Sequence, residues 1–554
     1  MADPRGRAGP GPSIAGRWAV AALVGWTIAA LAVVVLAVVP LGRLVEVALA
    51  ESGDGLASLV DGRSLQAIGN TLGVALAVTA LAVSGGVAAA LVTERSAARG
   101  RRWLRLGMLL PLLTPPFVAA VSWVRAYVPA ALSDELLGLT LPGLFGPVGI
   151  VAVLAVNAMP LAYVVAAAGL ATRAEPDLER AARVHGASGW GALRTVTLPL
   201  LRPAIVAGAV LVFVTSVNAF GVPAVLGIPA GFATVTTRIY QDLAFSADPA
   251  SFTRVVLLAC LLVLIALAAL AAAAVLGRRS PATRTGGGEG ASIPPSGRSW
   301  LPALVLAGYL VLTTILPLVA LVLTALTRAV GLPPTPANWT LENFTAAFEG
   351  RTAVALWNSF VLGVGAATLA LLLGGLAVIL ARRRAAGALP AAATLTFALP
   401  GSTLAVAILI TYGGWLRDTL LIILIAYVSK LWVLGLRPLA ASAERFPPDL
   451  LRASRASGAG PLTALVTVVL PLFRPVIVAA WLLVFLFALH ELTMSSLLYG
   501  PRSTTLAVVV LNLQQLGEPT VTAAFGVLLT LLVLAAALPL LLLRRTALQV
   551  LGWR

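Results

Sequence analysis

Few side chains in this 554-residue chain have the types and spacing that covalent or acid–base chemistry needs. The chain has two histidines, His185 and His490, one cysteine, Cys260, and one lysine, Lys430. It contains no His-x-x-x-His pair, cysteine cluster or Gly-x-Ser-x-Gly elbow, so neither a metal site nor an activated nucleophile is expected. A phosphate-binding Walker A loop needs a lysine directly after a glycine, whereas Lys430 follows Ser429. We therefore expect no enzyme activity, no ATPase site and no bound cofactor in this chain.

Four polar residues that could contact a substrate stand in long apolar stretches. An ionisable side chain inside a membrane costs about 3 kcal/mol or more unless it faces a cavity, a partner or the interior of a helix bundle. Glu491, next to His490, could bind a passing cation or polar substrate, or could form a hydrogen bond that fixes helix packing. Asn218 either lines a pathway or joins helices. Lys430 is expected to extend toward the nearer, cytoplasmic interface.

A polar segment with the same residues at the same spacing occurs twice. Residues 178–203 read LERAARVHGASGWGALRTVTLPLLRP, and residues 450–475 read LLRASRASGAGPLTALVTVVLPLFRP, which align without a gap at an offset of 272. In each copy a pair of small residues precedes a glycine, and Leu-Pro follows the glycine at the same distance. The matched residues are Ala181, Ala182, Gly186, Leu198 and Pro199 in the first copy and Ala453, Ser454, Gly458, Leu470 and Pro471 in the second.

Each copy is expected to fold as a helix, a turn and a second helix. A proline followed by an aspartate opens each copy, at 176 and 448, and both residue types are favoured in the first turn of a helix. Gly186 and Gly458 then supply the turn. An ordinary amphipathic loop would explain one copy, but two matched copies favour a pair of docking surfaces for partner proteins.

The composition indicates a membrane protein. Hydrophobic residues make up 60% of the chain and charged residues 11%, with a mean hydropathy of +0.99, whereas soluble domains are about half apolar and a quarter charged. A spanning helix needs roughly 20 apolar residues. Pro115-Pro116 and Pro400-Gly401 interrupt two such runs, and these breaks either line a pathway or only kink a helix. Twelve spans are predicted, near 18–42, 67–92, 106–126, 147–171, 199–227, 253–277, 300–326, 356–381, 387–412, 418–442, 472–499 and 520–543.

The spans form two similar halves. Each half has a leading span, a second one near Asn70 or Asn358, a proline-interrupted third, a fourth, the repeated loop and two more. Asn70 and Asn358 are expected to cap their helices. At the offset of 272, Asn218 of the first half matches His490 of the second. The expected fold is an all-α polytopic membrane protein of about 12 transmembrane helices, in two homologous six-helix halves related by a two-fold axis along the membrane normal.

Arginine predicts the orientation of the chain, because cytoplasmic loops are enriched in positive charge. Most arginines lie on one side of the predicted spans, together with both termini and both repeated loops. The expected parts are a cytoplasmic tail at 1–17, a first half at 18–277, a cytoplasmic linker at 278–298, a second half at 299–545 and a cytoplasmic tail at 546–554. The net charge of +17 is thus a topology signal, and nucleic acid is not an expected partner.

The repeated loop resembles the EAA loop of binding-protein-dependent ABC importer permeases, the segment through which these permeases dock on their ATPase subunits. The second copy departs from the pattern, with Leu451 in place of the glutamate and Ser454 in place of an alanine. The matching pattern of the first copy is Glu179-x-Ala181-Ala182-x3-Gly186-x9-Val196-x-Leu198-Pro199.

Residues 213–240 and 485–507 resemble the ferric-iron permeases, in which two permease halves are fused, and fused thiamine permeases are close relatives. The resemblance implies a type I ABC importer fold in the bacterial cytoplasmic (inner) membrane, surrounded by lipid and working by alternating access. It also implies two copies of an ATPase subunit that bind ATP-Mg, one per loop, and a periplasmic or lipoprotein solute-binding protein. Ferric iron is the expected substrate, with thiamine, polyamines or phosphonates as alternatives.

Two other classes of function fit part of the sequence. A secondary transporter driven by an ion gradient would also show twelve spans and a half-chain repeat, but would have no reason to keep two docking loops. A membrane scaffold without transport would need neither a polar pathway nor a partner ATPase. Co-purification of a nucleotide-binding subunit would distinguish the ABC permease from both.

Overall fold

The computed structural model describes residues 14–51, 60–95, 100–129, 131–173, 176–278, 300–329, 331–381 and 388–542. These ranges are helical and contain no strands, apart from an isolated bridge between Thr327 and Trp339. In this part of the chain ten helices are long and apolar enough to cross a membrane, or up to twelve when each of two bent pairs counts as one span. The predicted all-α class with about twelve spans is confirmed. The predicted tails and linker lie outside the described residues except at 14–17 and 278, which are helical.

The first half begins with α1, which continues through the π-helix η1 into α2, and ends with α14. Its main elements are α1 (Ile14–Val33), η1 (Val34–Val38), α2 (Val39–Ala50), α4 (Gly62–Arg95), α5 (Arg101–Leu113), α6 (Pro116–Tyr127), α7 (Leu132–Leu137), α8 (Pro147–Arg173), α9 (Pro176–Val184), α10 (Gly189–Ala192), η2 (Leu193–Thr197), α11 (Leu198–Val217), α12 (Gly221–Leu226), η3 (Ile228–Ala230), α13 (Val235–Ala244) and α14 (Ser251–Arg278).

The second half repeats this series. Its elements are α15 (Trp300–Leu310), η4 (Val311–Ile315), α16 (Leu316–Leu326), η5 (Pro336–Asn338), α17 (Glu342–Thr345), η6 (Ala346–Phe348), α18 (Gly350–Ala381), α19 (Ala388–Ala398), α20 (Gly401–Leu416), α21 (Leu420–Glu444), α22 (Pro448–Ala456), α23 (Pro461–Ala464), η7 (Leu465–Val469), α24 (Leu470–His490), α25 (Thr493–Leu498), α26 (Leu506–Leu516) and α27 (Pro519–Leu542). The elements α22, α23, η7 and α25 begin and end 272 residues after α9, α10, η2 and α12, so the duplication seen in the sequence extends to the backbone.

The third span of each half is sharply bent at the predicted break. The helix axis turns by 104° at Pro115-Pro116 and by 107° at Pro400-Gly401. Thr114 and Pro115 have extended backbones, as does Pro400. A residue before proline is disfavoured in the helical region, which accounts for the end of the helix at Thr114. These prolines therefore divide the span instead of merely kinking it.

The predicted spans at 199–227 and 472–499 are too long. The helices α11 and α24 end at Val217 and His490, and the short helices α12 and α25 follow as separate elements. The chain passes close to α6 at this point, because a Cβ on Gly221 would lie only 2.8 Å from the Cβ of Phe117. Glycine, which has no Cβ, permits this close approach at the start of α12. Hydropathy does not reveal the break, because the residues after it are as apolar as those before it.

The leading span of each half packs on the other half. Helix α2 packs against α20 of the second half, and α16 packs against α6 of the first half as well as against α27 of its own half. Pro40 lacks an N–H, and the Leu36 carbonyl four residues earlier accepts a hydrogen bond from the Ser429 hydroxyl of the second half. The equivalent proline of the seventh span frees the Thr313 carbonyl, which accepts from the indole N–H of Trp123 at 3.0 Å. These crossed contacts join the halves inside the membrane.

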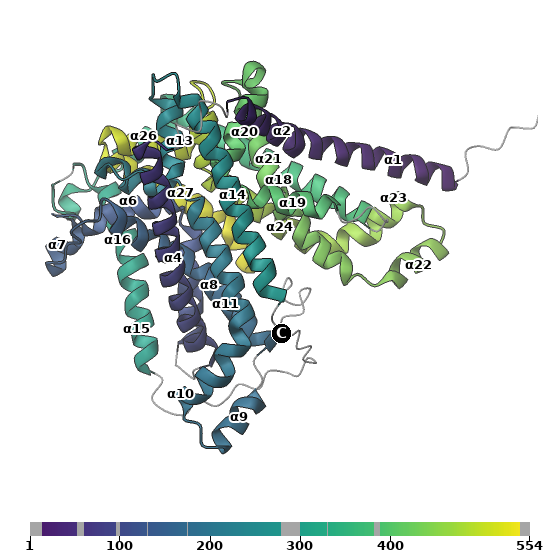
Figure 1. The fold of residues 1–554 in the computed structure, drawn as a ribbon, viewed down its shortest axis with the longest axis horizontal. Coiled ribbons are helices and arrows are strands. Elements are labelled where there is room, and N and C mark those ends of the chain that lie inside the picture. Colours follow the sequence, from purple (N-terminus) through teal and green to yellow (C-terminus); the bar gives the residue numbers. More distant parts are fainter. Residues whose placement is uncertain are drawn as a thin grey trace, which may run out of the picture.

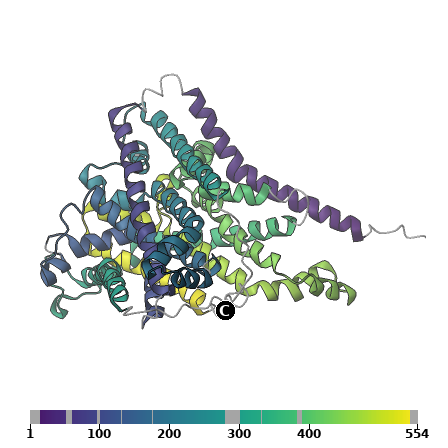
Figure 2. The ribbon, with the colours of Figure 1, turned by 60° about the horizontal axis from the view of Figure 1, so that its bottom comes forward.

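The two repeated loops lie at the far ends of spans that diverge. In Figure 1 α4, α8 and α11 of the first half run downward to α9 and α10, and α18, α21 and α24 of the second half run to the right, toward α22 and α23. The start of α1 lies on the side of α22 and α23, whereas α7, α13 and α26 lie on the opposite side. The turned view shows α1, in purple, running beside the green second half (Figure 2), in agreement with its packing against α18.

Candidate functional site

Both repeated loops fold as the predicted helix, turn and second helix. Helices α9 and α22 begin at Pro176 and Pro448. Gly186 and Gly458 follow with φ of 90° and 80°, a conformation that glycine adopts readily. In each copy the N–H after the glycine donates to the carbonyl five residues earlier at 3.0 Å, which is the Schellman ending of a helix. The two loops therefore have the same backbone, set by the residues that they share.

The small residues of the motif leave the loops open to a partner. In each copy the first small residue and the glycine are exposed, and the second small residue is half-buried. Large apolar side chains also face outward in the first loop, where Val184 is 84% exposed and Trp190 is 70% exposed. The second loop exposes Val466 and Leu470. Exposed apolar groups beside small residues suit a protein interface better than free solvent.

The Leu-Pro part of the motif shapes a helix. Leu198 and Leu470 each donate a backbone hydrogen bond to the residue five positions earlier, closing the π-helices η2 and η7, and Pro199 and Pro471 follow. The same arrangement closes η1 before Val39-Pro40 and η4 before Leu316-Pro317, in leading spans that belong to neither loop. In each loop Leu-Pro therefore marks a widened helical turn ahead of a proline.

Glu179 of the first loop is buried and bound within the chain. Its carboxylate forms an ion pair with Arg95, at the end of α4, and accepts a hydrogen bond from the Thr197 hydroxyl. Arg95 also donates to Thr197 at 2.9 Å. Only 6% of Glu179 is exposed. The glutamate of the motif thus fastens the first loop to the end of the second span.

The second loop has apolar residues where the first has this polar contact. At the offset of 272, Leu451 matches Glu179 and Val469 matches Thr197. Sequence reasoning identified the first replacement but missed Arg95 and Thr197 as partners of Glu179. The joint replacement of two polar residues by apolar ones was the available signal, because a buried polar residue is costly without its partner.

Glu491 lies at the break after α24 and forms an ion pair with Lys430 of α21. Lys430 Nζ and Glu491 Oε2 are 3.9 Å apart, and their side chains are 17% and 12% exposed. The expectation that Lys430 extends to the cytoplasmic interface is therefore wrong. The nearby carboxylate attracts the ammonium group, and Gly401, at the bend of the ninth span, leaves room for it: a Cβ there would lie 2.9 Å from Nζ.

The backbone around Glu491 is held by further hydrogen bonds. Its Oε1 accepts from the Met494 N–H at 3.0 Å, which satisfies a free donor in the first turn of α25. Its carbonyl accepts from the hydroxyls of Tyr427 at 3.0 Å and Ser495 at 2.6 Å. The carboxylate is thus fixed at one oxygen, and the other oxygen faces the lysine.

The other two candidates, Asn218 and His490, lie at the ends of α11 and α24 and form no hydrogen bond with each other. Asn218 follows α11 directly, and His490 is the last residue of α24. Asn218 Oδ1 and His490 Nε2 are buried without a hydrogen-bond partner among the described residues. Neither of these two atoms is hydrogen-bonded to the Lys430–Glu491 pair.

Asn70 and Asn358 are not helix caps, in contrast to the prediction. Their helices begin at Gly62 and Gly350, eight residues earlier. Asn70 instead donates to the Ala233 carbonyl at 2.8 Å, just before α13. In the second half Asn358 donates to the Thr504 carbonyl at 3.0 Å, just before α26.

Hydroxyl groups beside these asparagines complete the same contact. Thr71 accepts from the Val235 N–H and Ser359 from the Leu506 N–H, both at 2.8 Å. Both groups cap the helix that follows, which leaves fewer free donors at its start. The second span of each half therefore holds in place the helix that lies between the last two spans of that half.

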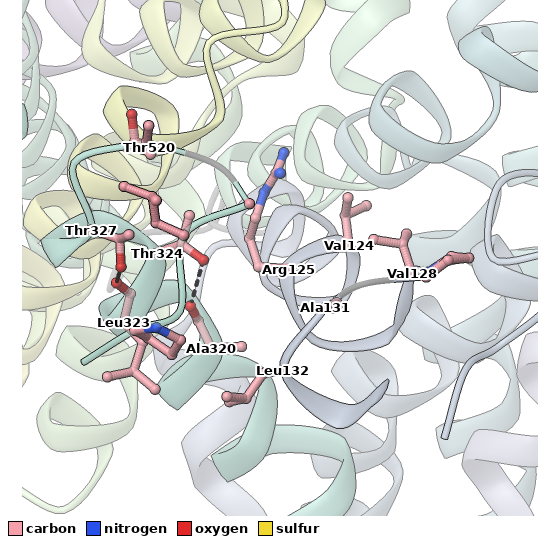
Figure 3. Close-up of a pocket in the computed structure, with 15 residues that line it drawn as sticks. Val124, Arg125, Val128, Ala131, Leu132, Ala320, Leu323, Thr324, Thr327 and Thr520 are labelled. Atoms are coloured by element: carbon pink, nitrogen blue, oxygen red, sulfur yellow. Dashed lines mark hydrogen bonds between the residues drawn. The ribbon is translucent and has the colours of Figure 1, made fainter. Parts of the chain in front are cut away.

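Cavities open on the face away from the loops. One of about 560 Å³ lies between the halves and is lined by Gln241 of α13 and by Gln514 and Gln515 of α26, among others. Another, of about 180 Å³, lies between α6 and α16, where Arg125 projects between the two helices (Figure 3). Arg125 donates to Gln514 at 3.4 Å. Sequence reasoning missed these glutamines, because an isolated polar residue near a span end carries no pattern.

Comparison with known proteins agrees with this duplicated geometry. The chain is 26% identical over 506 residues to the Fe(3+)-transport system permease protein FbpB 2 of Haemophilus influenzae, covering 88% of this chain and 90% of that protein. It is 25% identical over 481 residues to the ferric transport system permease protein FbpB of Actinobacillus pleuropneumoniae, covering 82% and 67%. A shorter match, 38% over 151 residues, covers 26% of this chain and 56% of the molybdenum transport system permease protein ModB of Mycobacterium tuberculosis.

A single family matches both halves, at residues 82–280 and 370–546, and is described as "Binding-protein-dependent transport system inner membrane component". Each match includes one repeated loop and the spans on either side of it. Together the two matches cover more than half of the chain, and this chain belongs to that family, the membrane-spanning permeases of ABC importers.

Proposed function

We propose that this chain forms the translocation pathway of an ATP-driven importer of ferric iron. The observation that carries the proposal is the likeness to permeases named for ferric transport over most of the chain, 88% in one relative and 82% in another. The relatives named for molybdenum or trehalose transport match between 24% and 33% of the chain, which is less than one half. Those matches support a shared permease module and leave ferric iron as the favoured substrate.

Each repeated loop is proposed to receive one copy of an ATPase subunit. Members of this family work with an ATPase and a solute-binding protein. The two loops have the same backbone conformation and lie at the ends of diverging spans, which supports two equivalent binding sites for that ATPase. The residues proposed to contact it are Ala181, Ala182, Gly186, Ala453, Ser454 and Gly458. ATP-Mg is bound by the partner subunits, and this chain contributes no cofactor site.

The loops and both termini are proposed to lie in the cytoplasm, with the membrane as the bacterial inner membrane. The arginine distribution supports this orientation, and so does the start of α1 on the side of α22 and α23. A periplasmic or lipoprotein solute-binding protein would then deliver its cargo to the opposite face, where the cavity lined by Gln241, Gln514 and Gln515 opens.

Transport is proposed to occur by alternating access between the halves. The spans diverge toward the loops, whereas the short helices α12 and α25 lie where the halves meet: a Cβ on Gly221 would be 3.3 Å from Leu492 of the other half. ATP-driven closure of the partner subunits would bring the two loops together and separate the halves on the opposite side. The crossed leading spans would keep the halves joined during this motion.

Uptake by the reconstituted complex tests the proposal. The permease, its ATPase and its solute-binding protein are placed in proteoliposomes, and uptake of radiolabelled ferric iron is compared with uptake of thiamine, with and without ATP inside. ATP-dependent iron uptake supports the proposal. Uptake of thiamine alone would retain the importer and reject the substrate, and iron uptake that follows an ion gradient without the ATPase would reject the importer.

A further inference from the structure

We propose that Glu491 balances the positive charge of the cargo as it passes between the halves, and that Lys430 is the counter-ion which the cargo displaces. This inference rests on the proposed import function and adds to it the residue that recognises the charge of the substrate. It also assigns a task to a lysine that otherwise stands in a span at an energetic cost.

The position of the pair supports a place on the pathway. Glu491 lies at the break between α24 and α25, and the next residue, Leu492, approaches Gly221 at the corresponding break of the first half. Lys430 reaches the same point from α21, beside the bend at Gly401. The pair therefore lies where three interrupted elements and both halves come together, rather than along an unbroken helix–helix seam.

The geometry of the pair leaves the carboxylate able to exchange partners. At 3.9 Å the two charged atoms attract each other without a direct hydrogen bond, and both side chains keep some exposure. A buried pair that serves packing alone is expected to be close, with its remaining hydrogen-bonding groups satisfied. Here the longer distance favours a contact that a third charged group can enter.

The difference in how the two groups are held indicates the sign of the cargo. Glu491 is pinned by the Met494 N–H on its carboxylate and by Tyr427 and Ser495 on its carbonyl. Lys430 places its charge on a flexible four-carbon stem. The fixed group is suited to bind and the movable group to withdraw, so the pair favours a cation over an anion.

A single carboxylate also suits a cargo that must leave again. Among the described residues no group of three or more His, Cys, Asp or Glu side chains could hold a metal ion. A site of that kind would retain ferric iron, whereas conduction requires binding weak enough for release. The first half has Ala219 at the position that matches Glu491, so one charge is offered and not two.

The decisive experiment compares single and double neutral variants in the reconstituted complex. The variants are Glu491→Gln, Lys430→Gln and the two together, and radiolabelled ferric iron uptake is measured with the iron-loaded binding protein. Glu46→Gln is the matched control, because it neutralises a carboxylate in an exposed ion pair with Arg43. Thermal unfolding of each purified variant shows whether it has folded.

We expect Glu491→Gln to lower iron uptake by about tenfold or more, the loss typical of one charge-assisted contact. Lys430→Gln should transport at a rate nearer to that of the unchanged protein, with a lower half-saturating concentration, because the cargo no longer competes with the lysine. The double variant should fold, since both charges are removed together, but should transport as poorly as Glu491→Gln. The control should transport normally.

Three outcomes would overturn the inference. Normal uptake by the folded double variant would assign the pair to packing, and loss of uptake in Lys430→Gln alone would assign it to an anion. If the unchanged complex imports molybdate and not iron, both the ferric substrate and the cation site are rejected. If it imports thiamine, which is also a cation, only the ferric substrate is rejected, and the same variants test the charge with thiamine.

Discussion

Replacing Glu179 with glutamine is expected to loosen the first repeated loop from α4 and to leave the second loop unchanged. The neutral amide loses the ion pair with Arg95 and weakens the bond from Thr197. Hydrogen bonds to charged groups contribute about 1.5–3 kcal/mol each. Since the Arg95 side chain is 19% exposed and can be hydrated, we take the lower part of that range for the whole contact, about 2 kcal/mol. This corresponds to roughly a 30-fold rise in the local opening equilibrium.

Amide hydrogen exchange in α9 measures this opening directly, because protection of a local unit follows its opening free energy. Exchange in α9 should speed up by about that factor, and exchange in α22 should not change. The same variant should use more ATP for each solute imported, because a loosely held loop transmits less of the ATPase motion. Asp449→Asn is the matched control: it breaks the exposed pair with Arg452 in the second loop, and such pairs contribute little.

Unchanged exchange in α9 would refute this account of Glu179. A second comparison guards against a general loss of folding. Changing Arg95 to methionine, Glu179 to leucine and Thr197 to valine together replaces the polar contact by an apolar one like that of the second loop. Because all three polar partners are removed at once, protection of α9 should largely return.

Three further predictions concern the face away from the loops. Asn358→Ala removes the side chain that donates to the carbonyls of Arg502 and Thr504 just before α26, and should lower the free energy of unfolding by about 1–3 kcal/mol, measured by denaturation in detergent. An unchanged free energy of unfolding would contradict the role inferred from these two hydrogen bonds. Asp242→Asn leaves the buried Arg254 without its bidentate partner and should cost about 3–5 kcal/mol in the same assay, whereas a cost below about 1 kcal/mol would indicate that solvent replaces the pair. The Ala250 N–H and then Arg254 hold the pKa of Asp248 below its ordinary value of 3.8, so the contribution of this carboxylate to stability is complete above that pH and is lost as the pH falls through the lowered pKa. The free energy of unfolding of Asp248→Asn should therefore be lower than that of the unchanged protein at neutral pH, and the two values should converge at low pH. A difference that stays constant with pH would contradict the lowered pKa.

The parts of the structure that repeat could be predicted from the sequence. Span number, the two halves and the helix–turn–helix of each loop rest on apolar length, on spacing and on glycine or proline at fixed positions, and all of these are local. Gly186 and Gly458 needed a positive φ, and Pro115-Pro116 and Pro400-Gly401 needed a break, whatever lay nearby. Local patterns of this kind are visible in a single chain.

The parts that depend on distant partners could not be predicted in this way. Lys430 and Glu491 are 61 positions apart, and each alone is only a charge in an apolar run. Glu179 finds Arg95 84 positions earlier, and Asn70 finds Ala233 163 positions later. The ends of α11 and α24 were missed for the same reason, because the chain turns where another helix approaches and the hydropathy stays high across the turn.

The two halves have elements with matching bounds, but they differ in side chains at positions that are proposed to contact the cargo or that hold a repeated loop in place. Position 219 of the first half, which matches 491 of the second, is an alanine, so the matched pair of positions offers one carboxylate and not two. Two carboxylates on one cation would hold it more firmly and slow its release. In the proposed pathway a single glutamate avoids this retention, and Lys430 neutralises that glutamate between turnovers. The departure from two-fold symmetry at this point therefore agrees with the proposed site for a positively charged cargo.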